Sequence, residues 1–403
     1  MSDHLAKPAD KYSPLYFLAS LGAGGIAVTF FMFLMFWVPH PGQPVPVFED
    51  IAQAFATGGL AMQAAIAVAV AGIAVFAFLN LKSLVWNLRA FASFRRTDAY
   101  EQLRASNAET TLLAMPLALA MSINVGFILG LVFVPGLWSI VEYLFPAAMV
   151  AFLLVGVLAF RQIADFLGRV LSEGGVFDVT AHNSFAQLLP AFALSMVGVG
   201  FAAPAAMSGA TLTVGTSLVL STFFGITAAL YAVIAAITAF NSMLHYGTAK
   251  ESGPTLMVVV PIMTVLGIVF LRQEHGLHAV FGAEANPGET MVFLARLLTV
   301  QLVFLGLGML VLLRQGYFDD FVIGSKTSPG SYALVCPAVA LSVMGQFFIN
   351  KGLVGAGVVE QFSAGYWALT SLALAAQLVA IALVLRLNRQ HFTPTEGAAV
   401  PAE

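Results

Sequence analysis

Three apolar stretches share one pattern: LLAMPLALAMSINVGF at residues 112–127, QLLPAFALSMVGVGF at 187–201 and LVCPAVALSVMGQFF at 334–348. Each contains a proline that is followed eleven residues later by a phenylalanine. Pro261, in a fourth stretch, continues the spacing of these prolines. The prolines Pro116, Pro190, Pro261 and Pro337 are 74, 71 and 76 residues apart. This spacing predicts a unit of roughly seventy residues that is used repeatedly along the chain.

The composition predicts an all-α integral membrane protein. Of the 403 residues, 60% are hydrophobic and only 9% are charged, and the mean hydropathy is +0.91. A hydrocarbon core about 30 Å thick needs about 20 apolar residues for each helical crossing. Ten stretches meet this standard: 14–38, 61–87, 109–134, 139–161, 186–204, 211–240, 254–272, 291–313, 330–350 and 364–386.

The basic residues predict the orientation of these stretches. With the N-terminus inside, only Arg272, Arg296 and Lys351 of the 17 lysines and arginines fall on the outer side. The positive-inside rule therefore places both termini in the cytoplasm, as an even number of crossings requires. We expect a cytoplasmic tail at 1–13, a ten-helix domain at 14–388 arranged as five helical hairpins, and a disordered cytoplasmic tail at 389–403. Low charge and short loops suggest a bacterial inner membrane.

Residues 88–107 interrupt the regular pattern. Aromatic residues such as Phe91 and Tyr100 alternate there with arginines such as Arg95 and Arg104. One interpretation is a helix that lies on the anionic cytoplasmic surface of the membrane. The other is a solvated charged turn.

The prolines separate the odd stretches from the even ones. Proline removes a helix hydrogen bond and kinks the helix, and a bilayer tolerates this only where the freed carbonyls face protein or a wet cavity. All four repeated prolines fall in odd stretches, and no comparable proline is expected inside an even one. Small residues also gather in the odd set, whereas even stretches suit lipid. The residues expected to kink the helices or line a pore are Gly22, Gly25, Pro116, Asn124, Pro190, Gly198, Pro261, Gly267, Pro337 and Gly345.

The eleven-residue offset gives each proline and its phenylalanine a common helix face. At about 100° per residue, eleven residues return to within about 20° of the starting direction. Such a face suits a narrow apolar pore, and it equally suits packing between helices. Both interpretations stay open from the sequence.

The proline-bearing helices and the SYALVCP stretch at 331–337 resemble the tellurite-resistance/C4-dicarboxylate transporter family, which is related to the plant slow-type anion channels. The resemblance covers roughly 14–388 and implies a homotrimer in which five odd helices form a central pore and five even helices form an outer ring. It also implies a phenylalanine gate before the proline of the ninth helix, where this chain has Cys336. The gate candidates are Cys336, Phe127, Phe201, Phe348, Phe192 and Phe270.

We expect this chain to be a channel-like permease for small inorganic or dicarboxylate anions. No charged residue lies near the midpoint of an odd stretch, so hydroxyls and amides such as those of Ser122, Asn124 and Thr264 would attract the anion. The outer loops contain seven acidic residues against three basic ones, which favours efflux or a mouth set away from the acids.

Two other functions stay open. The first is a proton-coupled C4-dicarboxylate or oxyanion carrier. The second, from another class, is a membrane subunit of a quinone oxidoreductase, although the seven histidines fall in tails, loops or helix ends. Apart from the lipid bilayer and the transported anion, we expect no cofactor, metal, catalytic residue or nucleic-acid partner.

Overall fold

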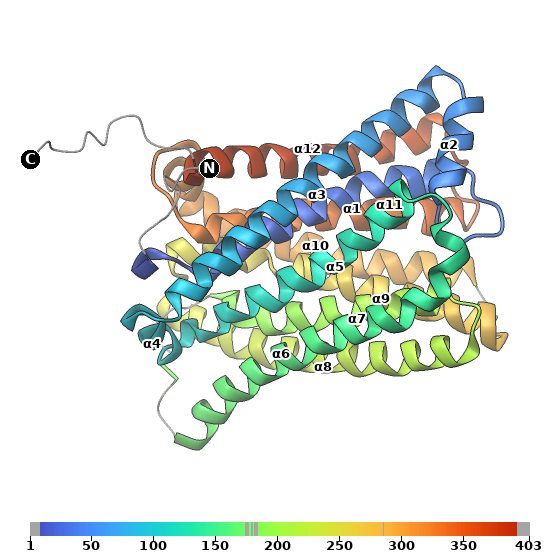
Figure 1. Ribbon diagram of the computed structural model, residues 1–403. Coiled ribbons are helices and arrows are strands. Elements are labelled where there is room, and N and C mark those ends of the chain that lie inside the picture. Colours follow the sequence, from blue (N-terminus) through green and yellow to red (C-terminus); the bar gives the residue numbers. More distant parts are fainter. Residues whose placement is uncertain (1–8, 174–176, 179, 181–183, 285, 393–403) are drawn as a thin grey trace, which may run out of the picture.

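The computed structural model describes residues 9–173, 177–178, 180, 184–284 and 286–392, and within them every regular element is helical. Ten of the helical segments are long and apolar enough to cross a membrane, at the places that the hydropathy predicts (Figure 1). The chain is therefore a multi-pass helical membrane protein by length and composition.

The five odd spans form the inside of the molecule. Between 56% and 100% of their apolar windows is buried within the protein. Each of their helices packs against the next, and the last packs against the first, so that they make a closed ring. They are α1 (Phe17–Trp37), α5 (Ala114–Phe133), α7 (Leu189–Met207), α9 (Val259–Phe281) and α11 (Val335–Phe347).

The five even spans lie outside this ring. Only 17% to 33% of their apolar windows is buried, so most of their leucine, valine and isoleucine side chains are exposed. Each packs against the odd helix that precedes it in the chain. They are α3 (Leu60–Phe94), α6 (Val141–Glu173), α8 (Thr211–Tyr246), α10 (Pro287–Arg314) and α12 (Ala364–Phe392).

A short 3₁₀ helix precedes each odd α-helix, and these five segments also touch their neighbours in a closed ring. They are η3 (Pro14–Tyr16), η4 (Asn107–Leu113), η6 (Phe185–Leu188), η7 (Lys250–Met257) and η9 (Pro329–Leu334). A serine precedes four of them, and in three of these the hydroxyl oxygen, of Ser13, Ser106 or Ser184, accepts a hydrogen bond from the backbone N–H group two residues later. Serine is a favoured N-cap because it satisfies an orphan donor.

The repeated prolines mark where these 3₁₀ helices become α-helices. Pro190 is the second residue of α7, and Pro116, Pro261 and Pro337 are the third residues of α5, α9 and α11. The first residues of an α-helix have no intrahelical acceptor for their N–H groups, so proline costs little there. The prolines thus begin helices rather than kink them. Pro146, inside α6, also contradicts the expectation that even helices lack an interior proline.

The remaining elements lie at the two ends of the bundle. Two are short α-helices and two have the wider π-helical turn. They are α2 (Phe48–Thr57), α4 (Asp98–Arg104), η2 (Ala9–Lys11), η5 (Leu137–Ile140), η8 (Asp319–Ile323) and η10 (Phe348–Val354).

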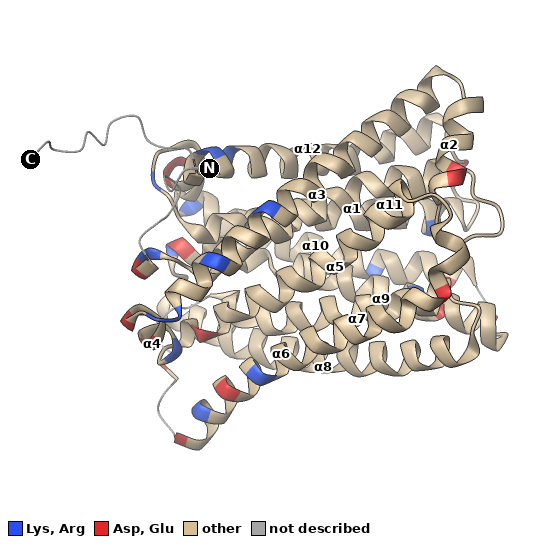
Figure 2. Cartoon of the chain, in the orientation of Figure 1, with Lys and Arg blue, Asp and Glu red and all other residues tan. Residues whose placement is uncertain are grey.

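We call the end that holds the first and last described residues the terminal end. Tyr16 of η3 contacts His391 of α12 there, with 3.2 Å between the phenol oxygen and Nδ1. Lysines and arginines gather at this end, and few lie at the opposite, far end (Figure 2). The last helix continues to Phe392, four residues past the predicted boundary at 388. Residues 1–8 and 393–403 of the predicted tails lie outside the described residues.

The stretch 88–107 is not one continuous helix of its own, and a turn with two exposed arginines, Arg95 and Arg96, divides it. The helix α3 continues through it to Phe94, and only the seven residues of α4 form a separate helix. Phe91 and Phe94 are buried, and the ring of Tyr100 packs on both of them at centroid distances of 6.1 and 5.6 Å. Phe91 and Phe94 therefore belong to the protein core, and the partly buried Tyr100 packs against them.

Candidate functional site: a five-helix cavity

A cavity of about 690 Å³ lies inside the ring of odd helices. All five odd helices contribute to its wall, mainly with leucine, isoleucine, valine, methionine and phenylalanine side chains. Its deepest lining residues toward the terminal end are Leu21, Phe192, Pro261 and Cys336. No described residue of the five 3₁₀ helices lines it, so the cavity stops where the 3₁₀ ring begins.

The far end of the cavity is basic. Arg272 lines it from α9, where its Nη1 donates a hydrogen bond to the carbonyl oxygen of Val199 at 2.8 Å. Lys351 lines it from η10, and His275 from α9; both are exposed, so the cavity reaches the protein surface here. Glu274 is the one carboxylate among the described lining residues, and no described carboxylate pairs with Arg272 or Lys351.

A chain of hydrogen bonds fixes the segment that carries Lys351. The indole N–H of Trp37 donates to the Tyr366 hydroxyl at 2.9 Å, and that hydroxyl donates to Oδ1 of Asn350 at 2.9 Å. The amide of Asn350 donates in turn to the carbonyl oxygen of Gln346 at 2.8 Å. Asn350 and Lys351 both line the cavity from the π-helical turn η10, a type of turn that is frequent at functional sites.

The acidic far-end loops do not surround this mouth. Glu49 accepts a hydrogen bond from the backbone N–H of Gly136 at 2.7 Å. Glu142 accepts one from the Ser208 hydroxyl and another from the Gly209 N–H, each at 2.7 Å. These carboxylates connect loops, and neither lines the cavity. Of the two interpretations of the outer acids, a mouth set away from them agrees with Glu49 and Glu142. Glu274 is the one acid of that count among the described lining residues, where it is accompanied by Arg272 and Lys351.

The polar side chains of the odd helices donate hydrogen bonds to acceptors within the protein. The hydroxyls of Ser122 and Ser195 donate to backbone carbonyls of their own helices at 2.9 and 2.8 Å. The Asn124 amide does the same at 3.1 Å, and Thr264 donates to the Ala340 carbonyl oxygen at 3.1 Å. Of these four, Asn124 and Thr264 line the cavity. The arrangement gives little support to hydroxyls as the main anion-attracting groups.

The residues expected to line a pore divide into two sets. Gly22, Gly25, Asn124 and Pro261 line the cavity, whereas Pro116, Pro190 and Pro337 do not. The other three glycines lie at helix contacts. A Cβ atom on Gly198 would lie 3.4 Å from α8, one on Gly267 would lie 2.5 Å from a side chain of α10, and one on Gly345 would lie 3.3 Å from α12.

The gate candidates divide in the same way. Cys336, Phe127 and Phe192 line the cavity, whereas Phe201, Phe270 and Phe348 do not. Phe201 is buried against Phe224 of α8, with the rings stacked at 5.3 Å. Phe270 is 42% exposed on the outer face. Phe348 begins η10 and packs beside Gly352.

Arg272 is the cavity residue that sequence reasoning missed, although the repeat contained a signal for it. Eleven residues after Pro261, where three other units have phenylalanine, this unit has Arg272. Pro261 and Arg272 both line the cavity, as a shared helix face predicts. The apolar stretch ends at residue 272, which predicts a turn there, whereas α9 continues to Phe281.

The fold and cavity define a multi-pass helical membrane protein with a one-sided internal vestibule. No protein-family model matches the chain, and neither a curated protein nor a solved structure matches it. Among the described residues, no group of three or more His, Cys, Asp or Glu side chains could hold a metal ion.

Proposed function

We propose that this protein is a channel-like permease for small anions. In this proposal the five odd helices surround a central pore and the five even helices wrap it, as five helical hairpins. The observation that carries the proposal is the cavity that all five odd helices line, with Arg272 and Lys351 at its open mouth.

The electrostatics of this cavity favour an anion over a cation. Its walls are apolar, so the field of a charge at the mouth is weakly screened inside it. Arg272 and Lys351 outnumber Glu274, whose Oε1 accepts a hydrogen bond from Thr290 at 3.4 Å. An anion entering from the far end thus meets two cationic groups before it reaches the apolar section, and a cation meets the same groups as a barrier.

Closure at the terminal end supports a gate there. Phe192 and Cys336 lie at the closed limit of the cavity, next to the ring of 3₁₀ helices. Opening requires that apolar side chains at this level separate, and narrow apolar constrictions gate by losing their water. In keeping with the family resemblance, the proposal includes a homotrimer in a bacterial inner membrane with cytoplasmic termini, so that the basic mouth faces outward.

Reversal potentials of the purified full chain in planar bilayers test this proposal. Gradients of chloride, nitrate, sulfite and malate with a constant potassium concentration should shift the reversal potential toward the anion equilibrium value. Bilayers without protein, and protein denatured before reconstitution, serve as controls. Currents that follow the potassium gradient, or no current with any of the four anions, would contradict an anion channel.

The one-sided opening of the cavity also favours a second candidate, an anion carrier. A carrier that alternates its access presents a cavity open to one side while the other side is closed. Proteoliposome uptake of malate, sulfite or tellurite separates the two functions. A carrier coupled to protons gives electroneutral flux that collapses with an uncoupler, whereas a channel gives electrogenic flux that does not require a proton gradient.

A further inference from the structure

A second, smaller cavity of about 230 Å³ lies at the terminal end, outside the ring of odd helices. It is bounded by the end of α3, by α4, by η4 and by α6. Arg95, Arg104 and Arg161 line it together with the carboxylates of Glu109 and Asp165. This cavity takes no part in the proposed anion pathway.

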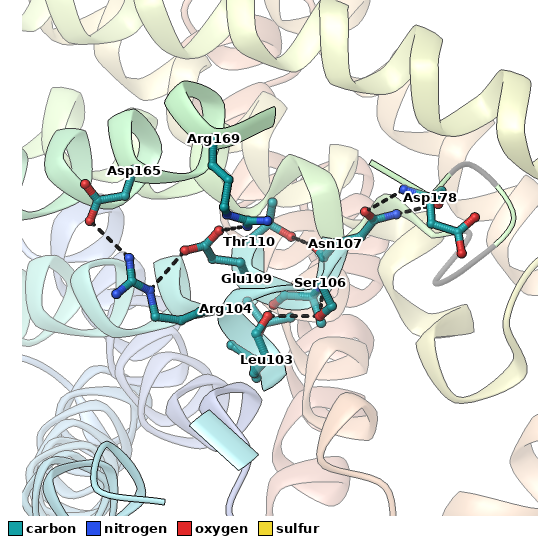
Figure 3. Close-up of polar contacts among 11 residues, drawn as sticks. Leu103, Arg104, Ser106, Asn107, Glu109, Thr110, Asp165, Arg169 and Asp178 are labelled. Carbon is teal, nitrogen blue, oxygen red and sulfur yellow. Dashed lines mark hydrogen bonds and ion pairs between the residues drawn. The ribbon is translucent and has the colours of Figure 1, made fainter. Parts of the chain in front are cut away.

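The carboxylates of this cavity already have partners. Nε of Arg104 lies 3.3 Å from Oε1 of Glu109, and its Nη2 lies 3.7 Å from Oδ2 of Asp165. Arg169 pairs with the second oxygen of Glu109 (Figure 3). The hydrogen bond to Glu109 raises the pKa of Arg104, so this guanidinium stays charged.

Two arginines of the cavity are left without a carboxylate partner. No described ion pair includes Arg95 or Arg161, and both side chains are exposed. Guanidinium groups bind phosphate oxygens through paired hydrogen bonds, and basic pockets between transmembrane helices bind anionic lipid head groups. The local excess of positive charge thus calls for an anion with several oxygens.

The cavity also holds an unused acceptor. Oε1 of Gln162 is buried and has no hydrogen-bond partner among the described residues. A buried acceptor without a donor is less stable than one that receives a hydrogen bond. A ligand that carries a hydroxyl group beside its phosphate would satisfy this oxygen while the arginines bind the phosphate.

Apolar side chains continue from both free arginines toward the middle of the membrane. Leu88 lies seven residues before Arg95 on α3, and Leu154 lies seven residues before Arg161 on α6. Seven residues return to within about 20° of the same helix face and advance about 10 Å along the axis. Leu88 is 37% exposed and Leu154 is 66% exposed. Each arginine therefore has an open apolar surface beside it, on the membrane side, where an acyl chain can lie.

We propose that this cavity binds the head group of an anionic phospholipid that carries both a phosphate and a hydroxyl group, such as a glycerol head group. The phosphate lies between Arg95 and Arg161, a head-group hydroxyl donates to Gln162 Oε1, and the acyl chains extend along α3 and α6.

Native mass spectrometry of the full chain in detergent tests this proposal. The ligands are dioleoyl phosphatidylglycerol, phosphatidylethanol, which keeps the charge but has no hydroxyl, phosphatidylcholine and soluble glycerol 1-phosphate. The double variant R95Q/R161Q should bind phosphatidylglycerol about 30-fold more weakly than the natural chain. Each basic residue near an anionic lipid contributes about 1 kcal/mol, and the loss of two, about 2 kcal/mol, converts to this factor at about 1.4 kcal/mol per tenfold change. The matched variant R89Q/R389Q removes two exposed arginines of the same end that do not line the cavity, and its affinity should be unchanged.

The hydroxyl part of the proposal has its own comparison. The natural chain should prefer phosphatidylglycerol to phosphatidylethanol by about threefold to tenfold, as one hydrogen bond provides, and Q162M should remove this preference. Equal binding by R95Q/R161Q and the natural chain would overturn the site. Equal affinity for glycerol 1-phosphate would assign it to a soluble phosphate instead of a lipid, and equal affinity for phosphatidylethanol would overturn the hydroxyl contact.

Discussion

Replacing Arg272 by glutamine removes one of the two cationic groups at the mouth of the cavity and keeps a hydrogen-bond donor for the Val199 carbonyl oxygen. Ile268, which also lines the cavity, precedes Arg272 by four residues on α9. At a rise of 1.5 Å per residue, an anion beside Ile268 is about 6 Å deeper in the cavity, along the axis of α9, than the backbone of Arg272. The charge therefore acts on a permeating anion at close range.

Coulomb's law gives the size of the expected effect. At about 6 Å, a unit charge attracts an anion by about 0.7 kcal/mol in bulk water and by about 3 kcal/mol at an effective dielectric constant of about 20. Since 1.4 kcal/mol corresponds to a factor of ten, R272Q should lower the anion-over-cation permeability ratio by about threefold to 100-fold. Solvent at the exposed mouth weakens the attraction and the apolar wall strengthens it, so we expect a decrease in the permeability ratio between about threefold and 100-fold.

Single-channel recording in planar bilayers at two salt concentrations measures this effect. The deficit of R272Q should be largest at about 0.01 M salt, where the Debye length is about 30 Å, and should shrink at about 1 M, where it is about 3 Å. R272K keeps the charge and should retain most of the selectivity. R296Q removes an exposed arginine of α10 that does not line the cavity, so it should match the natural chain. If R272Q also matches R296Q, or if its deficit does not depend on salt, the mouth is not what attracts the anion.

Three further variants test the ion pairs of Glu109, the gate at Phe192 and the contact between α9 and α7 at Gly276. E109Q removes the shared carboxylate of two arginines that both keep solvent access, so we expect a loss of about 1–3 kcal/mol, below that of a fully buried pair, seen as a lower melting temperature in detergent. F192A should raise anion leak by opening the closed end of the cavity, and F270A, whose ring is 42% exposed on the outer face, should not; equal flux would contradict a gate at Phe192. G276A places a Cβ atom 2.5 Å from a backbone carbonyl oxygen of α7 and should cost about 1–3 kcal/mol in the same melting assay. G126A, with open space around its Cβ, is the control, and a melting temperature for G276A equal to that of G126A would refute this contact.

Hydropathy was sufficient to place the ten spans because each one must supply its own apolar length. It failed at the ends of helices, where polar residues continue the helix. The α9 helix passes through Arg272 and His275 to Phe281, since these side chains face a cavity rather than lipid. A window average over the stretch cannot distinguish a polar residue in a loop from one that faces an internal cavity.

The role of the prolines was harder to predict because it depends on what precedes them. The sequence shows a proline within an apolar stretch, which predicts a kink if the helix extends to both sides. The chain instead enters each of these helices through a 3₁₀ segment, and the N-cap serines Ser106 and Ser184 were the available signal. The charge at the mouth of the cavity was hard to predict for a related reason. Glu49 and Glu142 belong to the same side of the protein as the mouth, but their carboxylate oxygens accept hydrogen bonds that connect loops, and neither residue lines the cavity.

The first repeat has the glycines Gly22 and Gly25 in place of the repeated proline, and the position of α1 in the ring explains them. As the first unit, α1 must close the ring against the last, α11. A Cβ atom on Gly22 would lie 2.9 Å from a side-chain carbon of Val335, and one on Gly25 would lie 2.8 Å from a side-chain carbon of Val339. The two glycines are three residues apart and the two valines four, so each pair spans about one turn of its helix. The glycines of α1 therefore accept two valines of α11 at the contact that makes a closed cavity out of an open row of helices. Small residues in this unit permit close approach of two helices, whereas the proline of the other four units begins a helix, so one repeat can differ in sequence from the others while the ring stays complete.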